Sequence, residues 1–557
     1  MKAAQAKLSK LIGHAEKQFI IPIYQRNYKW SKKNIEQFLD DLEEIDLSQI
    51  DYNHFLNSIV YSKINDNELA SNSGNRLEKY HIIDGQQRLT TNSLFLIAIR
   101  NTIQPRDTKT PNRINNQYIR NEWIDDIDDS IRLRLSNQDF EIYRKLVLKD
   151  ELNEDDKNHL IYKNYKLLEK YVKNYIEDDF NKIYDLIEKF EKRIDIIDTF
   201  LESHDNPQKI FSSLNSTGKA LKDTDLIKNL ILMNLSVNKQ NEFYTRFWIE
   251  IERVLDEKLL LNFFQHYLSM KMSYVVSSSN VYEAFEKLFK NTNDIEDIKK
   301  LLEELLKFAN IYKNLFLTST DFKYTYKSLN LLNIEAYYPL LMYIEANNNE
   351  MTEKTAKIIE NYLIRRAIVG LSPGKTKNVF VKVLKNIDVN SKSLDQDILV
   401  LLKSEQGQSR YPEIEFEDNI LTVPIYSNSK TITKYILYKI EYYLNTKNRS
   451  ITICYEDLTI EHILPETEYS KLPDCWINDF SLEIFEHYLH TIANLTLITQ
   501  NKNSSIGNSC FEDKINQYEN DTFLLTKEIA KEYEEWNIEA LKRRGEKIKN
   551  IMLEIWR

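Results

Sequence analysis

The C-terminal part of the chain carries residues whose types and order suit phosphodiester hydrolysis. Glu461-His462 is followed by Asn494, which precedes the apolar run Leu495-Thr496-Leu497, and then by Asn503. Hydrolysis needs a base for water, a divalent cation for the developing charge, and a group that holds the base in orientation. A histidine beside an acid, with two amides downstream, supplies the residue types for all three.

A second group of such residues lies near the N-terminus, at Asp84-Gly85-Gln86-Gln87-Arg88. A β-branched run precedes it at 80–83, and residues 89–99 follow with helical apolar spacing. The sequence therefore predicts a strand, a tight turn and a helix, and the free N–H groups at a helix start favour a phosphate. Arg88 would grip phosphate oxygens, Gln86 or Gln87 would read a base or ribose edge, and Asp84 would hold a metal or water. In the alternative, these groups only cap the helix and bond each other.

Length and composition indicate a large, mostly helical protein. A chain of 557 residues is too long for one core, and usual domain sizes suggest roughly three or four folding units. The net charge of −10 argues against a generic DNA-coating protein, because nonspecific affinity comes from Lys and Arg that neutralise phosphates. A DNA enzyme needs only a local basic groove. Lys542-Arg543-Arg544 with Lys547 and Lys549 would supply part of one or, alternatively, form a solvated helix face.

The cysteines and the hydropathy pattern favour a cytoplasmic protein. Cys454, Cys475 and Cys510 form no C-x-x-C pair, so the sequence indicates neither a disulfide framework nor a zinc knuckle. We find no signal segment and no run of about 18 apolar residues, and therefore expect no membrane contact.

The rest of the chain reads mainly as helices. The segment 19–24 is apolar but broken by Pro22, which is typical of an edge strand or an extended segment. Tyrosines and leucine recur at spacings of three and four over 162–175, as in an amphipathic helix. Residues 193–201 predict another strand, a helix begins near Asp223, and 240 to about 450 predicts helices without a chemical signature.

Three blocks in the N-terminal half resemble one known family. They are IPIYQRNYKW at 21–30, DGQQRLTT at 84–91 and FSSLNSTGKALKDTDLIKN at 211–229. In this order they resemble the N-terminal domain of the GmrSD-type modification-dependent restriction enzymes, a ParB/sulfiredoxin-like domain that uses a nucleoside triphosphate. The nucleotide-binding residues implied by the resemblance are Tyr24, Gln25, Arg26, Asp84, Gly85, Gln86, Gln87, Arg88, Asn215 and Lys228. Asp225 would line or support the site, or alternatively cap a helix.

The block from about 450 to the end resembles the second half of the same enzymes, an HNH nuclease domain of the ββα-metal class. The resemblance implies that His462 is the general base, that Asn494 orients it, and that Glu461 and Asn503 hold a metal ion. Asn503 would thereby also be part of the catalytic set. Oxygen ligands suit Mg²⁺ or Mn²⁺ better than zinc.

Two features of this block leave alternatives open. Ala493 stands where the family usually has glycine, and if the position needs a positive φ, alanine costs about 1 kcal/mol. His487 and His490 lie beside an apolar strand, where a histidine is more often packed or at the surface than in contact with substrate.

These patterns predict a mixed, predominantly α-helical protein in three parts. They are a ParB/sulfiredoxin-like NTP-binding α/β domain at 1–235, a helical connector at 236–445 and an HNH nuclease domain at 446–557. The predicted function is an NTP-regulated, metal-dependent DNA endonuclease with NTPase activity, of type IV restriction in anti-phage defence. The expected partners are modified double-stranded phage DNA, a nucleoside triphosphate and a second copy of the chain. The alternative is a nucleotide-responsive DNA-binding or toxin-like regulator whose HNH domain does not cut.

Overall fold

The computed structural model describes residues 1–49, 53–64, 77–104, 106–177, 179–202, 222–233, 235–290, 294–317, 322–448 and 455–557, with 204, 205, 207, 210 and 292. Helices dominate these residues, and the predicted mixed, predominantly α-helical class is confirmed. The chain forms two compact units, residues 1–250 with 285–302 and residues 251–284 with 303–557. None of the described helices is long and apolar enough to cross a membrane.

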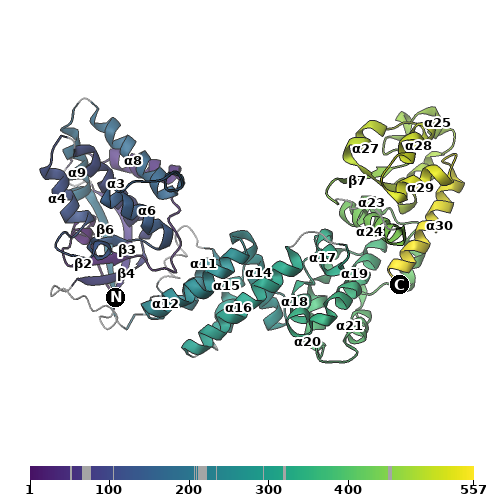
Figure 1. Ribbon diagram of the computed structural model, residues 1–557, viewed down its shortest axis with the longest axis horizontal. Helices are drawn as coiled ribbons and strands as arrows, with labels where there is room; N and C mark the ends of the chain where they lie inside the picture. Colours follow the sequence, from purple (N-terminus) through teal and green to yellow (C-terminus); the bar gives the residue numbers. More distant parts are fainter. Residues whose placement is uncertain are drawn as a thin grey trace. The chain divides into compact units, whose positions relative to one another are not determined.

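A mixed six-stranded sheet forms the centre of the first unit (Figure 1). Its strands are β1 (Lys2–Lys7), β2 (Lys17–Ile20), β3 (His54–Lys63), β4 (Glu78–Asp84), β5 (Leu133–Arg134) and β6 (Ile194–Leu201). They lie in the order β1-β6-β3-β4-β2-β5. β3 pairs in parallel with β6 and antiparallel with β4, while β2 is parallel to both of its neighbours. The strands predicted at 80–83 and 193–201 are therefore confirmed as β4 and β6.

Of the two alternatives predicted for 19–24, an edge strand or an extended segment, the edge strand was wrong. β2 ends at Ile20 and pairs with β4 on one side and with β5 on the other. Pro22 lies beyond the end of the strand, so its missing N–H costs no ladder hydrogen bond. The second partner, β5, lies more than a hundred residues later in the chain. It is only 2 residues long, which is too short to be predicted as a strand from the sequence.

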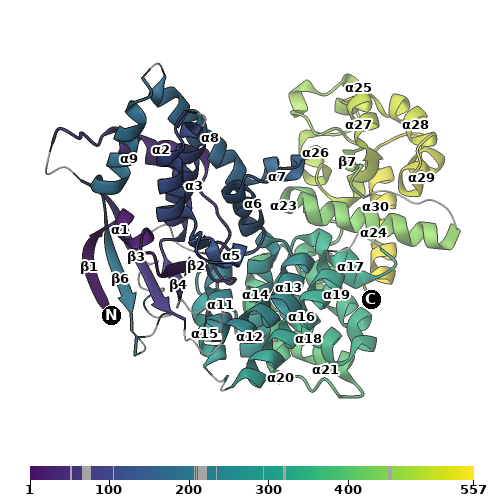
Figure 2. The same cartoon turned by 60° about the vertical axis from the view of Figure 1, so that its left-hand side comes forward.

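Helices of the first unit surround the chain segments of this sheet (Figure 2). They are α1 (Leu8–Ile12), α2 (Lys32–Glu43), α3 (Gln86–Ile103), α4 (Lys109–Ile114), α5 (Ile127–Ser130), α6 (Asn137–Leu148), α7 (Glu154–Asn158), α8 (Leu160–Ile176), α9 (Lys182–Arg193), α11 (Asp223–Leu232) and α12 (Val237–Phe243), with π-helical turns at Asn115–Ile119 and Tyr244–Trp248. α1, α3 and α9 contact strands of the sheet. α3 is buried over nearly its whole length and packs against α8, so its apolar run is not confined to one face. α8 buries Tyr165 and Leu168, as its predicted stripe requires.

The second unit is almost entirely helical. Its main helices are α14 (Glu257–Met272), α17 (Thr325–Ser328), α18 (Tyr338–Asn347), α19 (Thr352–Ile368), α20 (Lys377–Asn386), α21 (Leu394–Lys403), α22 (Ile414–Asn419), α23 (Ile425–Asn428) and α24 (Lys430–Asn448). The helices α13 (Ile249–Val254), α15 (Val281–Phe289) and α16 (Ile295–Phe316) contain residues assigned to both units. α24 continues across residue 445, where we predicted a domain boundary, and packs against later helices of the chain. The helices expected for 240–450 are confirmed.

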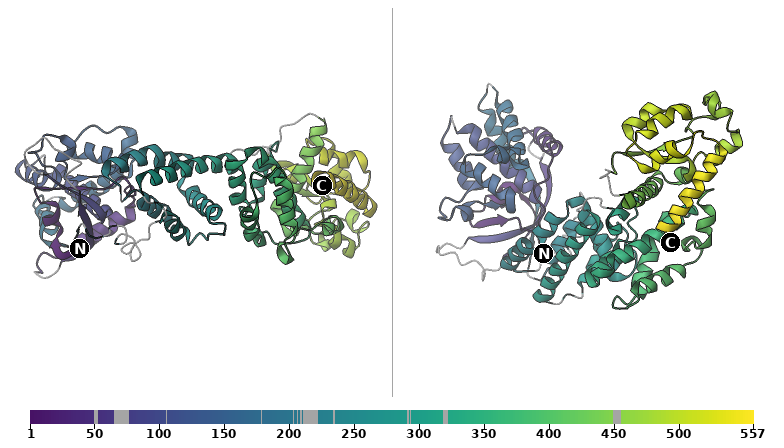
Figure 3. Two further views of the ribbon diagram at one scale, coloured as in Figure 1. Left: turned by 90° about the horizontal axis from the view of Figure 1, so that it is seen from below. Right: turned by 45° about the vertical axis from the view of Figure 1, so that its right-hand side comes forward.

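The C-terminal part of this unit holds an antiparallel pair, β7 (Leu458–His462) and β8 (Leu495–Thr499). Around it lie α25 (Asp474–Ile477), α26 (Leu482–Tyr488), α27 (Gln500–Ile506), α28 (Phe511–Glu519), α29 (Leu524–Glu532) and α30 (Ile538–Ile555), with a 3₁₀ turn at Ile492–Asn494. Figure 3 shows the yellow helix α30 beside the green helix α24, which it contacts.

The cysteine prediction was wrong in one respect. Cys475, in α25, and Cys510, just before α28, form a disulfide. The two residues are 35 positions apart in the sequence, so no short spacing motif indicates that they pair. Cys454 lies outside the described residues. The cytoplasmic location, which we inferred partly from unpaired cysteines, stays a prediction.

Candidate functional site

The turn between β4 and α3 carries the first candidate site. Gly85 has φ +98° and begins α3, and a Cβ built on it would lie 2.4 Å from Ile59 Cδ1. The backbone angle therefore favours glycine, and any larger residue would also force the end of the Ile59 side chain to shift. One helical turn further on, Arg88 Nη2 donates to Asp84 Oδ2 at 2.9 Å, and its Nη1 donates to the carbonyl of Leu56. The acid and the arginine of the motif are thus side by side.

Two of the predicted amides hold the preceding loop in place. Gln25 Nε2 donates to the carbonyl of Ile83 at 3.0 Å, which fastens segment 22–30 to the end of β4. Gln87 Oε1 accepts from Lys29 N at 2.8 Å, and its Nε2 donates to the carbonyl of Asn27. Both side chains are buried. The role of base reader proposed for Gln87 does not fit, since both ends of its amide already bond the backbone.

Arg26 differs from these amides, because its Nε is buried and has no hydrogen-bond partner. A buried guanidinium N–H without an acceptor costs free energy that an anion could recover. Gln86 is also buried at the start of α3, and Tyr24 is almost completely enclosed, so that burial raises the pKa of its hydroxyl. The segments that hold Arg26, Asp84 and Arg88 are joined through Gln25 and Gln87.

The third N-terminal block is only partly described. Asn215 lies outside the described residues. Lys228 is buried in α11, where its Nζ lies 3.8 Å from Asp225 Oδ1. Asp225 is in the first turn of the same helix, where a carboxylate is favoured by the helix dipole. The capping alternative for Asp225 therefore has local support.

The second candidate site lies at the end of β7, where Glu461 and His462 are adjacent. Successive side chains of a strand point to opposite faces, so the two residues have different surroundings. Glu461 Oε1 accepts from Lys514 Nζ at 2.7 Å and from Tyr518 Oη at 3.0 Å, both in α28. Lys514 Nζ also donates to the carbonyl of His462. Glu461 is therefore a member of a buried ion pair.

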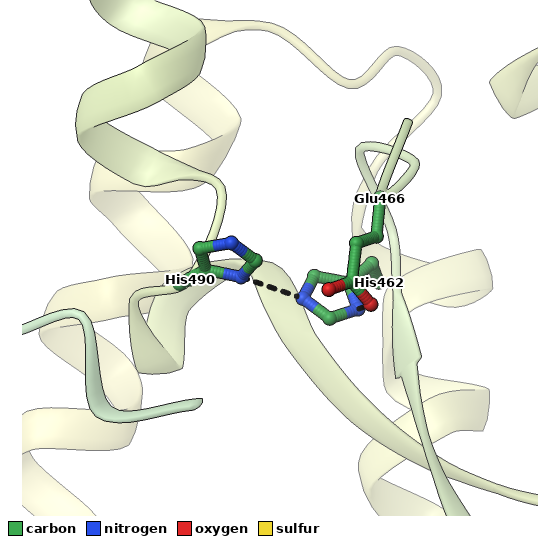
Figure 4. Close-up of side chains that lie close together, drawn as sticks. All are labelled: His462, Glu466 and His490. Atoms are coloured by element: carbon green, nitrogen blue, oxygen red, sulfur yellow. Dashed lines mark hydrogen bonds and ion pairs between the residues drawn. The ribbon is translucent and has the colours of Figure 1, made fainter. Parts of the chain in front are cut away.

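His462 instead faces His490 and Glu466 (Figure 4). Its Nε2 is 3.2 Å from His490 Nδ1, and its Nδ1 is 3.7 Å from Glu466 Oε2. One ligand atom from each of the three residues lies within 4.8 Å of the other two. Burial lowers the pKa of His462 to about 3, with further lowering by His490, Lys514 and Lys430. Its imidazole is thus neutral near pH 7 and has a lone pair to accept a proton or bind a metal.

A tyrosine from an earlier helix fixes both histidine rings. The Tyr426 ring of α23 stacks on His490, with centroids 5.4 Å apart and planes inclined by 12°. The same ring meets His462 edge-on at 4.4 Å, and Tyr426 N donates to the carbonyl of His490. Lys430 Nζ lies 4.7 Å from the centre of this ring. Burial lowers the pKa of His490, Lys430 lowers it further, and Glu466 raises it.

Asn494 positions the histidines through the backbone. It is fully buried, its Oδ1 accepts from Leu464 N at 2.7 Å, and its Nδ2 donates to the carbonyls of Leu464 and Leu489. Leu464 follows His462 by two residues and Leu489 precedes His490. The amide therefore ties the two segments together without touching either ring.

The two predicted metal ligands, Glu461 and Asn503, are engaged in other bonds, and their role as ligands stays a prediction. Glu461 Oε1 is occupied by the Lys514 ammonium and the Tyr518 hydroxyl, and Glu461 lies on the opposite face of β7 from His462. Asn503, in α27, donates from Nδ2 to the carbonyl of Ile460 at 3.2 Å. A divalent ion at Glu461 would have to displace a buried ammonium group.

The predicted basic cluster is largely neutralised. Arg544 is buried and donates to the carbonyls of Ile492, Ala493 and Leu495. Lys547 pairs with Glu528 and Glu532, and Lys549 pairs with Glu417. Arg544 is therefore not part of an exposed basic groove, whereas for Lys547 and Lys549 the groove stays a prediction.

Ala493 is not strained. It lies in the 3₁₀ turn at Ile492–Asn494, and the described non-glycine residues with a positive φ are Asn57, Lys149, Glu177, Ser273 and Asn333. Its methyl group instead faces Gly545 of α30, where an added Cβ would come within 3.3 Å of it.

Sequence reasoning missed Glu466 and Tyr426, and it gave Lys514 no partner. Glu466 follows His462 by four residues, beyond Pro465, and this spacing alone gave no reason to group them. Tyr426 precedes His462 by 36 positions in the numbering of the chain and has no motif around it. Lys514 was part of the resembling block, but its pairing with Glu461 is a contact between elements.

Comparison with protein families identifies the class of the chain as a restriction endonuclease. Residues 8–232 match the N-terminal domain of GmrSD restriction endonucleases, and residues 412–551 match their C-terminal domain. The chain belongs to the GmrSD restriction endonuclease family, whose substrate is DNA. No curated protein matches it. The C-terminal match begins before α23 and α24, so it includes Tyr426 and Lys430.

Proposed function

We propose that the protein is an NTP-regulated, metal-dependent endonuclease of the HNH type that restricts modified phage DNA. Family membership gives the coarse class, type IV restriction. The observation that carries the catalytic part is the His462–His490–Glu466 cluster, held by Tyr426 and Asn494 at the end of the β7–β8 pair.

In this proposal His462 is the general base. Its Nε2 accepts the proton of the attacking water, and Glu466, near Nδ1, stabilises the imidazolium that results. With a pKa near 3, His462 is a weak base in the protein without DNA. A phosphodiester bound next to it adds negative charge and raises that pKa. Asn494 holds the histidine-bearing backbone and takes no proton. When bound, the divalent ion would neutralise charge on the phosphate.

The proposed nucleotide site is the β4–α3 turn with the loop at 22–30. Arg26 would bind phosphate through the guanidinium whose Nε has no partner, and the N–H groups at the start of α3 would face the same anion. Arg88 would join them, oriented by Asp84. Gln25, Gln87 and Gly85 keep the loop and the turn in place.

Plasmid cleavage in the presence of Mn²⁺ tests the catalytic assignment. His462→Ala should lower cleavage by about 100- to 10,000-fold, the usual contribution of a general base, while leaving NTP hydrolysis unchanged. His487→Ala is the matched control, since this histidine contacts Tyr488 and lies outside the cluster. Cleavage by His462→Ala within tenfold of wild type would exclude His462 as the base. A panel of phages that differ only in DNA modification tests the substrate class.

A further inference from the structure

Among the described residues two groups could bind a metal through three side chains. One is Glu202, His204 and Asp205, in the first unit. Its two carboxylates already pair with the N-terminal ammonium group, and Glu202 also pairs with Lys2. The other is His462, Glu466 and His490, where the Tyr426 ring contacts both histidine rings and Lys430 lies close to that tyrosine.

We propose that the divalent ion of the nuclease centre is held by His490 and Glu466, and not by Glu461 and Asn503. This inference rests on the proposed function. The carboxylate of Glu461 is neutralised by Lys514, whereas Glu466 is partly exposed and lies next to the histidine pair. Glu466 is thus the carboxylate that faces the catalytic histidine.

In this arrangement His490 Nδ1 and one oxygen of Glu466 would hold the ion. His490 Nδ1 lies 3.2 Å from His462 Nε2, so holding the ion would require these two nitrogens to part. His462 Nε2 would then be free to accept a proton from water, and the ion would supply positive charge to the phosphate.

The ligand types also indicate which ions should bind. An imidazole together with a carboxylate suits Zn²⁺ better than Mg²⁺, which prefers oxygen ligands alone. The same centre built from Glu461 and Asn503 would have only oxygen ligands and would favour Mg²⁺ or Mn²⁺. Mn²⁺ also accepts an imidazole beside oxygen ligands, so it can be used to test either set. The choice of ion and the choice of residues are therefore linked.

Mn²⁺ binding to the full-length protein without DNA tests the ligands apart from cleavage. Glu466→Gln and His490→Asn should each weaken binding by at least tenfold, since even outer-shell changes cost about 10- to 100-fold in metal affinity. Glu468→Gln and His487→Asn are matched controls nearby, and Asn503→Ala should also bind as wild type does. Lys430→Met should bind Mn²⁺ more tightly, because it removes a nearby positive charge.

Pulsed electron paramagnetic resonance of the bound Mn²⁺ identifies the nitrogen ligand directly. The wild type should show ¹⁴N modulation from an imidazole, which His490→Asn loses and His487→Asn keeps. Loss of binding in Asn503→Ala with normal binding in Glu466→Gln would overturn the inference, as would wild-type protein that binds no Mn²⁺. Plasmid cleavage by the same samples distinguishes the proposal about the metal ligands from the proposal about the nuclease centre. Unimpaired cutting by His462→Ala would refute the nuclease assignment, whether or not Mn²⁺ binding depends on His490 and Glu466.

Discussion

The two candidate sites each begin with an acid followed by a basic residue in a short motif, yet only one motif keeps these side chains together. Asp84 is the last residue of β4 and Arg88 lies in the first turn of α3, and the tight turn at Gly85 brings Arg88 Nη2 to 2.9 Å from Asp84 Oδ2. Glu461 and His462 are neighbours in β7, so the strand sends their side chains to opposite faces. The adjacent residues Glu461 and His462 therefore have side chains on different faces of β7. The side chains of Asp84 and Arg88, four residues apart, are in contact.

The difference also decides what each acid does. Asp84 is partly exposed and orients an arginine. Glu461 is buried and compensates a buried lysine, and the acid that faces His462 comes from four residues later. A motif that spans a tight turn from a strand to a helix can bring its own side chains together, whereas the motif on β7 is completed by residues of other segments.

The largest effect should follow from removing the lysine partner of Glu461. Lys514→Met leaves a carboxylate buried without its cation, and breaking such a pair costs about 3–5 kcal/mol. Hydrogen exchange of the β7 and β8 amides should report this loss as faster local opening. The double variant Glu461→Gln/Lys514→Met should recover much of the stability, since no charge stays buried. If Lys514→Met protected these amides as well as wild type, Glu461 would be free of Lys514 and available as a ligand.

The next effect concerns the turn that begins α3. Gly85→Ala should destabilise the amides of α3 by about 2–4 kcal/mol, because a left-handed φ and a clash with Ile59 act together. Gly370→Ala separates the two causes. Gly370 has φ +71° but no atom within 4 Å of its built Cβ, so its substitution should cost only about 1–2 kcal/mol locally. Equal costs at the two positions would show that the close contact with Ile59 is not rigid.

The elements that sequence could predict are those whose signal is local. The β4 turn and α3, the stripe on α8 and strand β6 follow from patterns of apolar residues within one segment. The pairing of β2 with β5, the Cys475–Cys510 bond and the contact of Lys514 with Glu461 join distant segments, and no local pattern encodes them. His462 was identified from its motif, whereas Glu466 and Tyr426 acquire a role only when the chain folds around it.

At the N-terminal site two arginines should respond differently to substitution. Arg26→Met should weaken nucleotide binding by about 1.5–3 kcal/mol, the value of a hydrogen bond to a charged group, without lowering stability, because Nε of Arg26 has no partner to lose. Arg88→Met should weaken binding similarly but also destabilise the start of α3, since it loses its bonds to Asp84 and Leu56. Calorimetric titration with NTP and hydrogen exchange measure the two quantities. Unchanged affinity in both variants would mean that this motif only builds the turn.

The smallest effect concerns communication between the two sites. A nuclease that cut at all times would endanger the chromosome of its host, so nucleotide should change the cutting rate by favouring one of two conformations. Such a coupling is typically about 1–3 kcal/mol, which corresponds to about 5- to 150-fold in rate when the conformational equilibrium limits cutting. Asp84→Asn keeps the size of the side chain but removes the charge that orients Arg88, so it should abolish the response while basal cutting stays the same. Cleavage of modified and plain DNA should be compared without nucleotide, with NTP and with a nonhydrolysable analogue. Identical cleavage rates under all three conditions would mean that the two sites act independently. The β4–α3 turn would then not regulate the histidine cluster.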